Sequence, residues 1–548
     1  MKKKALVVCM LLPYLAWSCS NDSDYLSLQG RDKNQKHFYF NAQVGSDKNK
    51  GESADSPIKS LYMLQNVQLE AGDSVFLRKG ITQKGSIILR DVHGTKDNPV
   101  VITSYGAEEE YAQIDAKGNL AGILMENCSH VVVSGIQVNA DGSGNISDKD
   151  ARTAGMRCGV LYRVTKDGSY QGITLKDLLI NNIYIEEKGY RRDPDEVNTA
   201  NGTEQYGWGI RFINESLGAS LSRLLVENCK IENVSHTGIK FSGKKYNITD
   251  SEVRNCVVRE VGGPGIQMSG VKDVHVHHNV VDRSGSTIDS RHWGRGSGYW
   301  CWGSDRVLVE YNRLTNANGP NDSAGAHIDY NCKNVIYQYN FSANNVGAFC
   351  EILGNNYNCC YRYNISVNDG QRKKVGKNEN GYSLMVSGYT GGKNTGPFNS
   401  YIYNNTIYVS EENFSRIAIT RTAEGVCIAN NIFHIQGKSV AITTDQFVGP
   451  TKNAFMTNNL FVLNSSWNSA NHVQDTNPIY GNAQFVKPGG LDIQDYISQN
   501  RLLVKDKGMR ITALPDDEIG LFKGLEVSHD ILGNPITGNP DLGAIELN

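Results

Sequence analysis

An internal repeat constrains the fold of this chain more than any other feature of its sequence. Short strand-like runs each end in an asparagine that is followed by another apolar pair, as in LLVENCKI, VLVEYNRL and YIYNNTIY. The series consists of Asn182, Asn228, Asn255, Asn279, Asn312, Asn340, Asn364, Asn405, Asn431 and Asn459. From Asn228 onward the gaps are 27, 24, 33, 28, 24, 41, 26 and 28 residues. A period of this length is typical of one coil of a β-solenoid, with insertions in two or three coils.

The repeat has a simple physical explanation. One coil cannot bury its apolar side alone, so coils stack and each strand pairs with the equivalent strand of the next coil at roughly 4.8 Å. An asparagine between two strands tolerates a tight backbone, and its amide can hydrogen-bond the amides one coil above and one coil below. We therefore predict an all-β fold, a single-stranded parallel β-helix (solenoid) with loop insertions and capping segments, in which these asparagines are structural.

A second repeated strand lies between the asparagine corners and begins at a glycine. Seven of these strands begin at Gly209, Gly238, Gly265, Gly298, Gly325, Gly347 and Gly381. When they are aligned on the glycine, alternation turns the second and fourth residues inward and the third and fifth outward. Three consecutive coils are therefore predicted to present six side chains on one outer face, namely Trp300, Trp302, His327, Asp329, Phe349 and Glu351.

Asp329 and Glu351 are predicted to occupy one outward column on adjacent coils, with their backbones roughly 4.8 Å apart. Two carboxylates this close repel each other, so one pKa rises and one falls, which separates a general acid from a base or nucleophile. His327, on the same face, is a candidate auxiliary acid or base. The open alternatives are a calcium site, which Asp322 would help to complete from the preceding loop, and a solvated surface. No other metal and no cofactor is expected.

Aromatic and basic residues near this pair predict carbohydrate binding. Exposed indoles at Trp300 and Trp302 are costly unless they bind something, and flat rings suit the apolar faces of sugars. The alternative for both is burial beneath the insertion at residues 284–296, whose arginines either hold an acidic sugar or pair with local acids. A second insertion at residues 369–396, with Tyr389, is predicted to form the far wall. The substrate-binding candidates are Trp300, Trp302, Phe349, Arg291, His292, Trp293, Arg295 and Asp322.

The first residues indicate export. Lys2, Lys3 and Lys4 precede an apolar run from Ala5 to Ala16, which is too short to span a bilayer and has the layout of a secretory signal. The run ends in LAWSC, which resembles a lipobox and predicts Cys19 as a lipid anchor. The alternative is an ordinary signal peptide followed by a plain thiol. The expected location is the cell envelope, at the outer membrane on its periplasmic or surface face, with the lipid as the only membrane contact.

Composition and charge exclude other classes. The formal net charge is −2 and the basic residues are matched by acids throughout, which argues against a nucleic-acid partner. Most of the 12 cysteines lie in strand-like runs and are predicted to be small buried hydrophobes, although Cys229 and Cys256 leave one disulfide open. The run His275, His277 and His278 looks metal-binding by residue type, but a strand run without further ligands favours a surface.

The asparagine corners resemble those of the pectate-lyase-type right-handed β-helix of secreted carbohydrate-active proteins. The opening FYFN at residues 38–41 and the closing PDLGAIE at residues 540–546 resemble the capping segments of such helices. The resemblance is specific for fold and weak for chemistry, because this fold hosts hydrolases, lyases and binding proteins. Among β-helix hydrolases the chain is generally similar to glycoside hydrolase family 141, without a matching catalytic motif. It lacks the paired-aspartate and Gly-His-Gly pattern of polygalacturonases.

This organisation predicts five segments. They are a signal peptide at 1–18, a polar tether at 19–36, a cap with the first coils at 37–120, the β-helix at 121–465 and a closing segment at 466–548.

Three functions follow. The favoured one is a glycoside hydrolase that uses Asp329 and Glu351 on a poly- or oligosaccharide. The second is a polysaccharide lyase on uronate-containing glycans, which the basic residues Arg211, Lys240 and Arg291 keep open. The third is a non-catalytic glycan-binding protein.

Overall fold

The computed structural model describes residues 35–141, 156–185, 206–286, 295–319, 322–371, 382–413, 416–436, 451–462 and 473–547. The described residues from 36 onward form one compact unit. Among the residues described, no helix has both the length and the apolar character needed to cross a bilayer. Cys19 and the apolar run before it lie outside the described residues.

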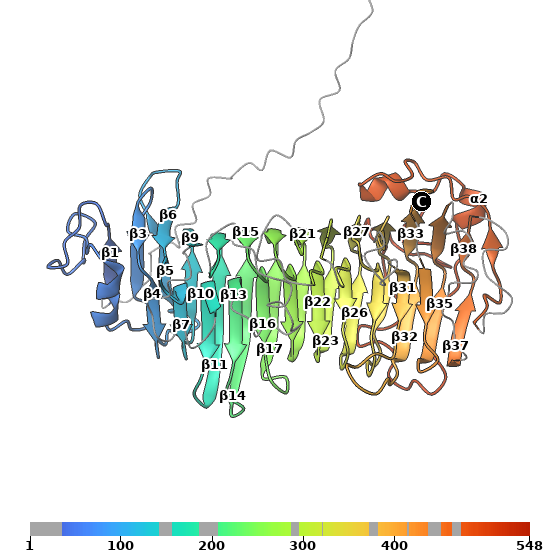
Figure 1. Ribbon diagram of the computed structural model, residues 1–548, viewed down its shortest axis with the longest axis horizontal. Coiled ribbons are helices and arrows are strands. Elements are labelled where there is room, and N and C mark those ends of the chain that lie inside the picture. The colour runs from blue at the N-terminus through green and yellow to red at the C-terminus, as the bar shows by residue number, and fades with distance from the viewer. Residues whose placement is uncertain are drawn as a thin grey trace, which may run out of the picture. The chain divides into compact units, whose positions relative to one another are not determined.

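Three long parallel sheets build the unit from residue 36 onward, and successive turns of the chain add strands to each of them (Figure 1). Each strand pairs with the strand one coil earlier and the strand one coil later, as β14 does with β11 and β17. The architecture is the predicted right-handed parallel β-helix, because a crossover between parallel strands is almost always right-handed.

The first sheet contains β1 (His37–Phe40), β2 (Ser74–Arg78), β5 (Val100–Tyr105), β8 (Val131–Ser134), β11 (Gly168–Lys176), β14 (Ala219–Glu227), β17 (Ile248–Arg254), β20 (Val271–His277), β23 (Asp305–Glu310), β26 (Lys333–Gln338), β29 (Cys360–Arg362), β32 (Phe398–Tyr403), β35 (Glu424–Ala429) and β37 (Lys452–Thr457). The second sheet contains β3 (Thr82–Lys84), β6 (Ala112–Asp115), β9 (Ile136–Ala140), β12 (Leu179–Ile183), β15 (Lys230–Val234), β18 (Val257–Val261), β21 (Val280–Ser284), β24 (Arg313–Thr315), β27 (Phe341–Ala343), β30 (Ile365–Val367), β33 (Thr406–Val409), β36 (Ile432–Ile435), β38 (Leu460–Phe461) and β39 (Ile479–Tyr480). The third sheet contains β4 (Ile87–Arg90), β7 (Ala121–Glu126), β10 (Met156–Val164), β13 (Tyr206–Asn214), β16 (Ile239–Ser242), β19 (Ile266–Ser269), β22 (Tyr299–Trp302), β25 (Ala326–Ile328), β28 (Cys350–Ile352), β31 (Tyr382–Val386) and β34 (Arg416–Ile419).

The predicted asparagine ladder lies at the corner between the first and second sheets. Its members are buried and hydrogen-bond in succession through their side-chain amides, with Nδ2 to Oδ1 distances of 2.9 to 3.1 Å. They are Asn279, Asn312, Asn340, Asn364, Asn405, Asn431 and Asn459. The carboxylate of Asp475 accepts the last bond, at 2.8 Å.

Three of the ten predicted ladder asparagines lie elsewhere. Asn228 and Asn255 have φ values of 53° and 54° and stand one residue before the ladder position, which Cys229 and Cys256 fill as buried free thiols. The disulfide left open for these cysteines is therefore absent. Asn182 lies inside β12, where the pairing with β9 shifts register, and not at the corner. The corner uses two adjacent positions. The first has a left-handed backbone conformation and the second points its side chain inward, and asparagine suits both.

The third sheet confirms the predicted alternation but not its register at one coil. Ile328 pairs with Ile352, so Glu351 follows His327 in its column, and the prediction that it follows Asp329 is wrong. Core packing sets this register, because apolar side chains must continue the inward columns.

Phe349 is displaced by the same shift. It was predicted to point outward toward substrate, but it is fully buried in the main core and packs edge-on against Tyr361, with ring centroids 5.7 Å apart. Phe349 lies at a bend one residue before β28, so strand alternation does not apply to it, and Cys350 and Ile352 take the two inward positions of the strand itself.

Residues 473–547 cover one side of the late coils. They include the 3-10 helix η4 (Ile493–Tyr496) and the short helix α2 (Arg501–Val504), whereas η1 (Leu61–Asn66) belongs to the first coils. A second apolar cluster joins this segment to strands of the first and second sheets, and it includes Leu514 and Ile531 from the segment and Tyr401 from β32.

Candidate active site

The predicted site residues meet on the outer face of the third sheet, around β22, β25 and β28. A pocket of about 720 Å³ opens there. Its lining includes Lys240, Gln267, Arg295, Trp300, Trp302, Asp322, His327, Asp329, Tyr330, Glu351 and Tyr389. Seven of the predicted site residues line this pocket, together with the predicted far-wall residue Tyr389. They are Arg295, Trp300, Trp302, Asp322, His327, Asp329 and Glu351.

His327 lies at the centre of the acidic cluster. Its Nε2 is 3.9 Å from Oδ1 of Asp329 and 3.8 Å from Oε1 of Glu351. Burial lowers the pKa of the imidazole, but the charges of Glu351, Asp329 and Asp322 outweigh burial and leave that pKa raised. Within the described residues neither ring nitrogen has a hydrogen-bond partner, although both are buried. Such a ring is suited to a hydrogen bond with a bound hydroxyl.

Asp329 is a buried carboxyl with two fixed donors. Its Oδ2 accepts the indole N–H of Trp300 at 3.0 Å, and its Oδ1 accepts the backbone N–H of Tyr330 at 2.8 Å. Burial raises the pKa of Asp329, and although His327 and both donors oppose this rise, the pKa stays above its ordinary value. The carboxyl therefore holds its proton to higher pH than an exposed aspartate does.

Asp322 faces the same cluster from the loop before β25. Its Oδ2 is 3.2 Å from Nε of Arg295, and its side chain is more exposed than that of Glu351, at 22% against 10%. This ion pair corresponds to the local pairing that the sequence left open for Arg295. Arg291, His292 and Trp293 lie outside the described residues.

Of the two tryptophans predicted to be exposed, Trp302 is exposed and Trp300 is buried. Trp300 is 5% exposed and stacks on His327, with ring centroids 5.9 Å apart and an interplanar angle of 18°. Its prediction as an open sugar platform is wrong, because its indole packs flat against the next coil and bonds to Asp329. Trp302 is 38% exposed and contacts Tyr330 edge-on, so it is the indole available to a ligand.

The pocket extends along the stack to residues that the sequence analysis did not include in the site. Lys240 and Gln267 precede Trp300 in the same outward column. Lys240 is buried, its Nζ lies 4.9 Å from the ring centroid of Trp208, and burial lowers its pKa to about 7. Tyr330 was also missed, since it follows the strand and only the fold brings it to the pocket. The aligned third positions were the signal that could have found Lys240 and Gln267.

Asp322, His327 and Glu351 also form a group that could hold a metal ion, because one ligand atom from each lies within 4.8 Å of the others. Calcium requires six to eight oxygen ligands, and here a buried imidazole occupies the centre of the group. The residues therefore fit the calcium alternative poorly, and a transition metal that accepts nitrogen fits better.

The fold and the pocket define a right-handed parallel β-helix of the kind found in carbohydrate-active proteins. A family model described as the right handed beta helix region matches residues 208–407. A lacto-N-biosidase of Bifidobacterium longum subsp. longum is 23% identical over 612 residues, which covers 93% of this chain and 36% of that protein. The chain thus spans about a third of the length of this curated relative.

Two solved structures share the fold. The family 136 glycoside hydrolase lacto-N-biosidase of Eubacterium ramulus has a TM-score of 0.51 and 19% identity, covering 81% of this chain and 66% of that one. XylC in complex with xylose has a TM-score of 0.51 and 11% identity, covering 93% and 98%. The resemblance to β-helix carbohydrate-active proteins is confirmed, and the family named among these matches is 136, where the sequence suggested 141.

Proposed function

We propose that this chain is a glycoside hydrolase that cleaves a poly- or oligosaccharide in the pocket on the third sheet. The observation that carries the proposal is Asp329, a buried carboxyl with a raised pKa that lies among further carboxylates in an open pocket. The similarity to proteins named lacto-N-biosidase supports this reaction class and makes a lacto-N-bioside the first substrate to test.

Asp329 is the proton donor in this proposal. Glycoside hydrolysis uses one carboxylic acid to protonate the leaving oxygen, and that acid must keep its proton near neutral pH. Burial supplies this property, while the indole of Trp300 and the backbone N–H of Tyr330 fix the orientation of the carboxyl group.

Asp322 is the second carboxylate, acting as nucleophile or base. It forms an ion pair with Arg295, and it is the more exposed of the two remaining acids, so a substrate in the pocket can reach it. Glu351 lies deeper, with Oε1 3.8 Å from Nε2 of His327, and its role in this proposal is to position the imidazole that contacts the substrate. This assignment replaces the pairing of Asp329 with Glu351 that strand alternation suggested.

Three matched amide variants test the roles. Asp329→Asn and Asp322→Asn are expected to lower kcat about 1,000-fold, the size of an acid–base contribution, on a lacto-N-bioside or another glycan from a panel. Glu351→Gln is expected to cost about 10- to 100-fold, because it acts through His327. Circular dichroism checks that each variant is folded.

Two outcomes would change the assignment. If Glu351→Gln is as inactive as Asp329→Asn while Asp322→Asn retains activity, the pair is Asp329 and Glu351. If no glycan is cleaved by the wild type but glycans bind equally to all variants, the chain is a glycan-binding protein and the enzymatic proposal fails.

A polysaccharide lyase is the second candidate, and Lys240 is the observation that favours it. A lyase needs a base to remove a proton beside a uronate carboxyl, and a lysine with a pKa of about 7 is suited to that role. Elimination leaves an unsaturated ring that absorbs ultraviolet light. New absorbance on uronate polymers, lost in Lys240→Ala, would identify a lyase.

We also propose that the chain is exported and anchored by a lipid on Cys19, on the strength of its lipobox-like segment LAWSC. The wild type is expected in the membrane fraction and Cys19→Ser in the soluble fraction of the envelope. Mass spectrometry of the mature N-terminus provides the direct check, and an unmodified Cys19 in the mature protein would rule the anchor out.

A further inference from the structure

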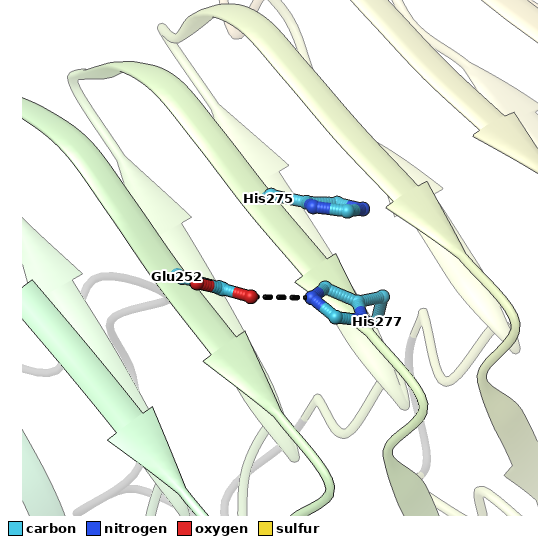
Figure 2. A group of neighbouring side chains, drawn as sticks. All are labelled: Glu252, His275 and His277. Carbon is cyan, nitrogen blue, oxygen red and sulfur yellow. Dashed lines mark hydrogen bonds and ion pairs between the residues drawn. The ribbon is translucent and has the colours of Figure 1, made fainter.

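A second cluster of possible metal ligands lies on the outer side of the first sheet, on strands that do not line the pocket. His275 and His277 are two residues apart on β20, so alternation places both side chains on one face. Glu252 lies on the adjacent strand β17, opposite His275 in register. Figure 2 shows the two imidazole rings one above the other, with the carboxylate of Glu252 directed at His277.

The donor atoms of these three side chains are close enough for one ion. One ligand atom from each lies within 4.8 Å of the others, and Nε2 of His277 is 2.7 Å from Oε1 of Glu252. The two rings are nearly parallel, with centroids 3.9 Å apart. Zn–N and Zn–O bonds are about 2.0 to 2.2 Å long, so ligands of one zinc ion lie about 3 to 4 Å apart. Small side-chain rotations therefore suffice, and partial exposure lets water complete the coordination.

Neighbouring residues hold the other nitrogen of each ring. Nε2 of His275 is 2.9 Å from Oε1 of Glu310, and Nδ1 of His277 is 2.8 Å from Nδ1 of His278. Glu310 is itself held by the amide of Gln338, at 2.6 Å. Metal-binding histidines usually have their second nitrogen fixed by such a partner, which orients the ring toward the ion. This arrangement leaves Nδ1 of His275 and Nε2 of His277 for a metal.

The charge around the cluster also favours a cation. Glu227, Glu252 and Glu310 are three carboxylates, and Arg254, which pairs with Glu227 and Glu252, supplies one positive charge. With neutral imidazoles the group is left with an excess of negative charge, which a divalent cation would balance.

We propose that Glu252, His275 and His277 bind a zinc ion, with Glu310 positioning His275. The sequence analysis favoured an ordinary surface position for this histidine run over metal binding, because the third ligand comes from another coil. A zinc ion here would join two neighbouring coils and so stabilise the folded chain.

Calorimetric titration of the metal-free full chain with zinc chloride tests the site. The wild type is expected to bind one equivalent more than the double variant His275→Ala/His277→Ala. His93→Ala is the matched control, since it removes an exposed imidazole elsewhere in the β-helix. His327→Ala removes a possible ligand of the pocket group Asp322, His327 and Glu351. If the zinc ion binds on the first sheet, this variant still binds the equivalent of zinc that the double variant loses.

Two conservative variants keep the test decisive if the double variant does not fold. Glu252→Gln and Glu310→Gln are each expected to weaken zinc binding about 10-fold or more. Zinc is also expected to raise the Tm of the wild type and of His93→Ala, but not that of the double variant. Equal stoichiometry and affinity in the wild type and the folded double variant would overturn the proposal, and so would unchanged affinity in Glu252→Gln.

Discussion

Asp329 shows how position changes the chemistry of an ordinary side chain. An exposed aspartate is ionised at neutral pH and cannot donate a proton, whereas burial raises the pKa of this one. The indole N–H of Trp300 opposes that rise, because it stabilises the ionised carboxylate. The working pH range of the proposed acid therefore depends on the balance between burial and the stabilisation of the carboxylate by His327, the backbone N–H of Tyr330 and the indole of Trp300.

Trp300→Phe is expected to move the basic limb of the pH profile of kcat/KM to higher pH. Loss of the N–H donor removes stabilisation of ionised Asp329, so its pKa rises further and the acid stays protonated to higher pH. A hydrogen bond to a charged group contributes about 1.5 kcal/mol, which corresponds to a shift of about one pH unit. Trp302→Phe, on the same strand, is the control and should leave the limb in place. A limb that stays or moves to lower pH in Trp300→Phe would show that Asp329 is not the titrating acid.

At the scale of elements, the asparagine corner connects the coils. Oδ1 of Asn340 accepts the backbone N–H of Asn312 at 2.9 Å, and its Nδ2 donates to the carbonyl of Val309 at 2.9 Å. Both bonds satisfy backbone groups one coil away, where no water reaches them. The ladder therefore fixes the spacing of the coils that carry the pocket.

Asn340→Ala is expected to lower the free energy of unfolding by about 3 kcal/mol, because it leaves buried backbone groups without partners. Urea unfolding followed by circular dichroism measures the change. Asn66→Ala, at an exposed asparagine, should alter it by less than about 0.5 kcal/mol. Similar losses in the two variants would argue against a structural role for the ladder.

At the scale of the whole unit, the residues after the last coil cover the side of the late coils and bury charged groups. Glu546 is buried beside Asp541, whose backbone N–H it accepts at 3.0 Å. Burial and the nearby carboxylates raise the pKa of Glu546 to about 8. The closing segment therefore makes the stability of the folded chain depend on pH through a group that lies outside the repeated coils.

The sign of this dependence follows from proton binding. Between about pH 4.3, where an unfolded glutamate ionises, and pH 8, the folded chain holds a proton on Glu546 that the unfolded chain has lost. This contribution to stability is complete at low pH and falls as the pH rises through that window. Glu546→Gln is expected to reduce the difference between denaturation midpoints at pH 5.5 and pH 8.5, whereas the exposed Glu526→Gln should not. An unchanged difference in Glu546→Gln would contradict the prediction.

The sequence by itself determined the parallel β-helix, because a spaced asparagine beside alternating apolar residues is a local signal that repeats in every coil. It also identified the face that carries His327, Asp329 and Glu351, since alternation depends only on odd and even positions. The register of β28 was decided by core packing between coils, which aligned Glu351 with His327 and turned Phe349 inward. Only the tertiary structure could bury Trp300 against Asp329 or place Glu252 beside His277, because each of these contacts joins residues of different coils.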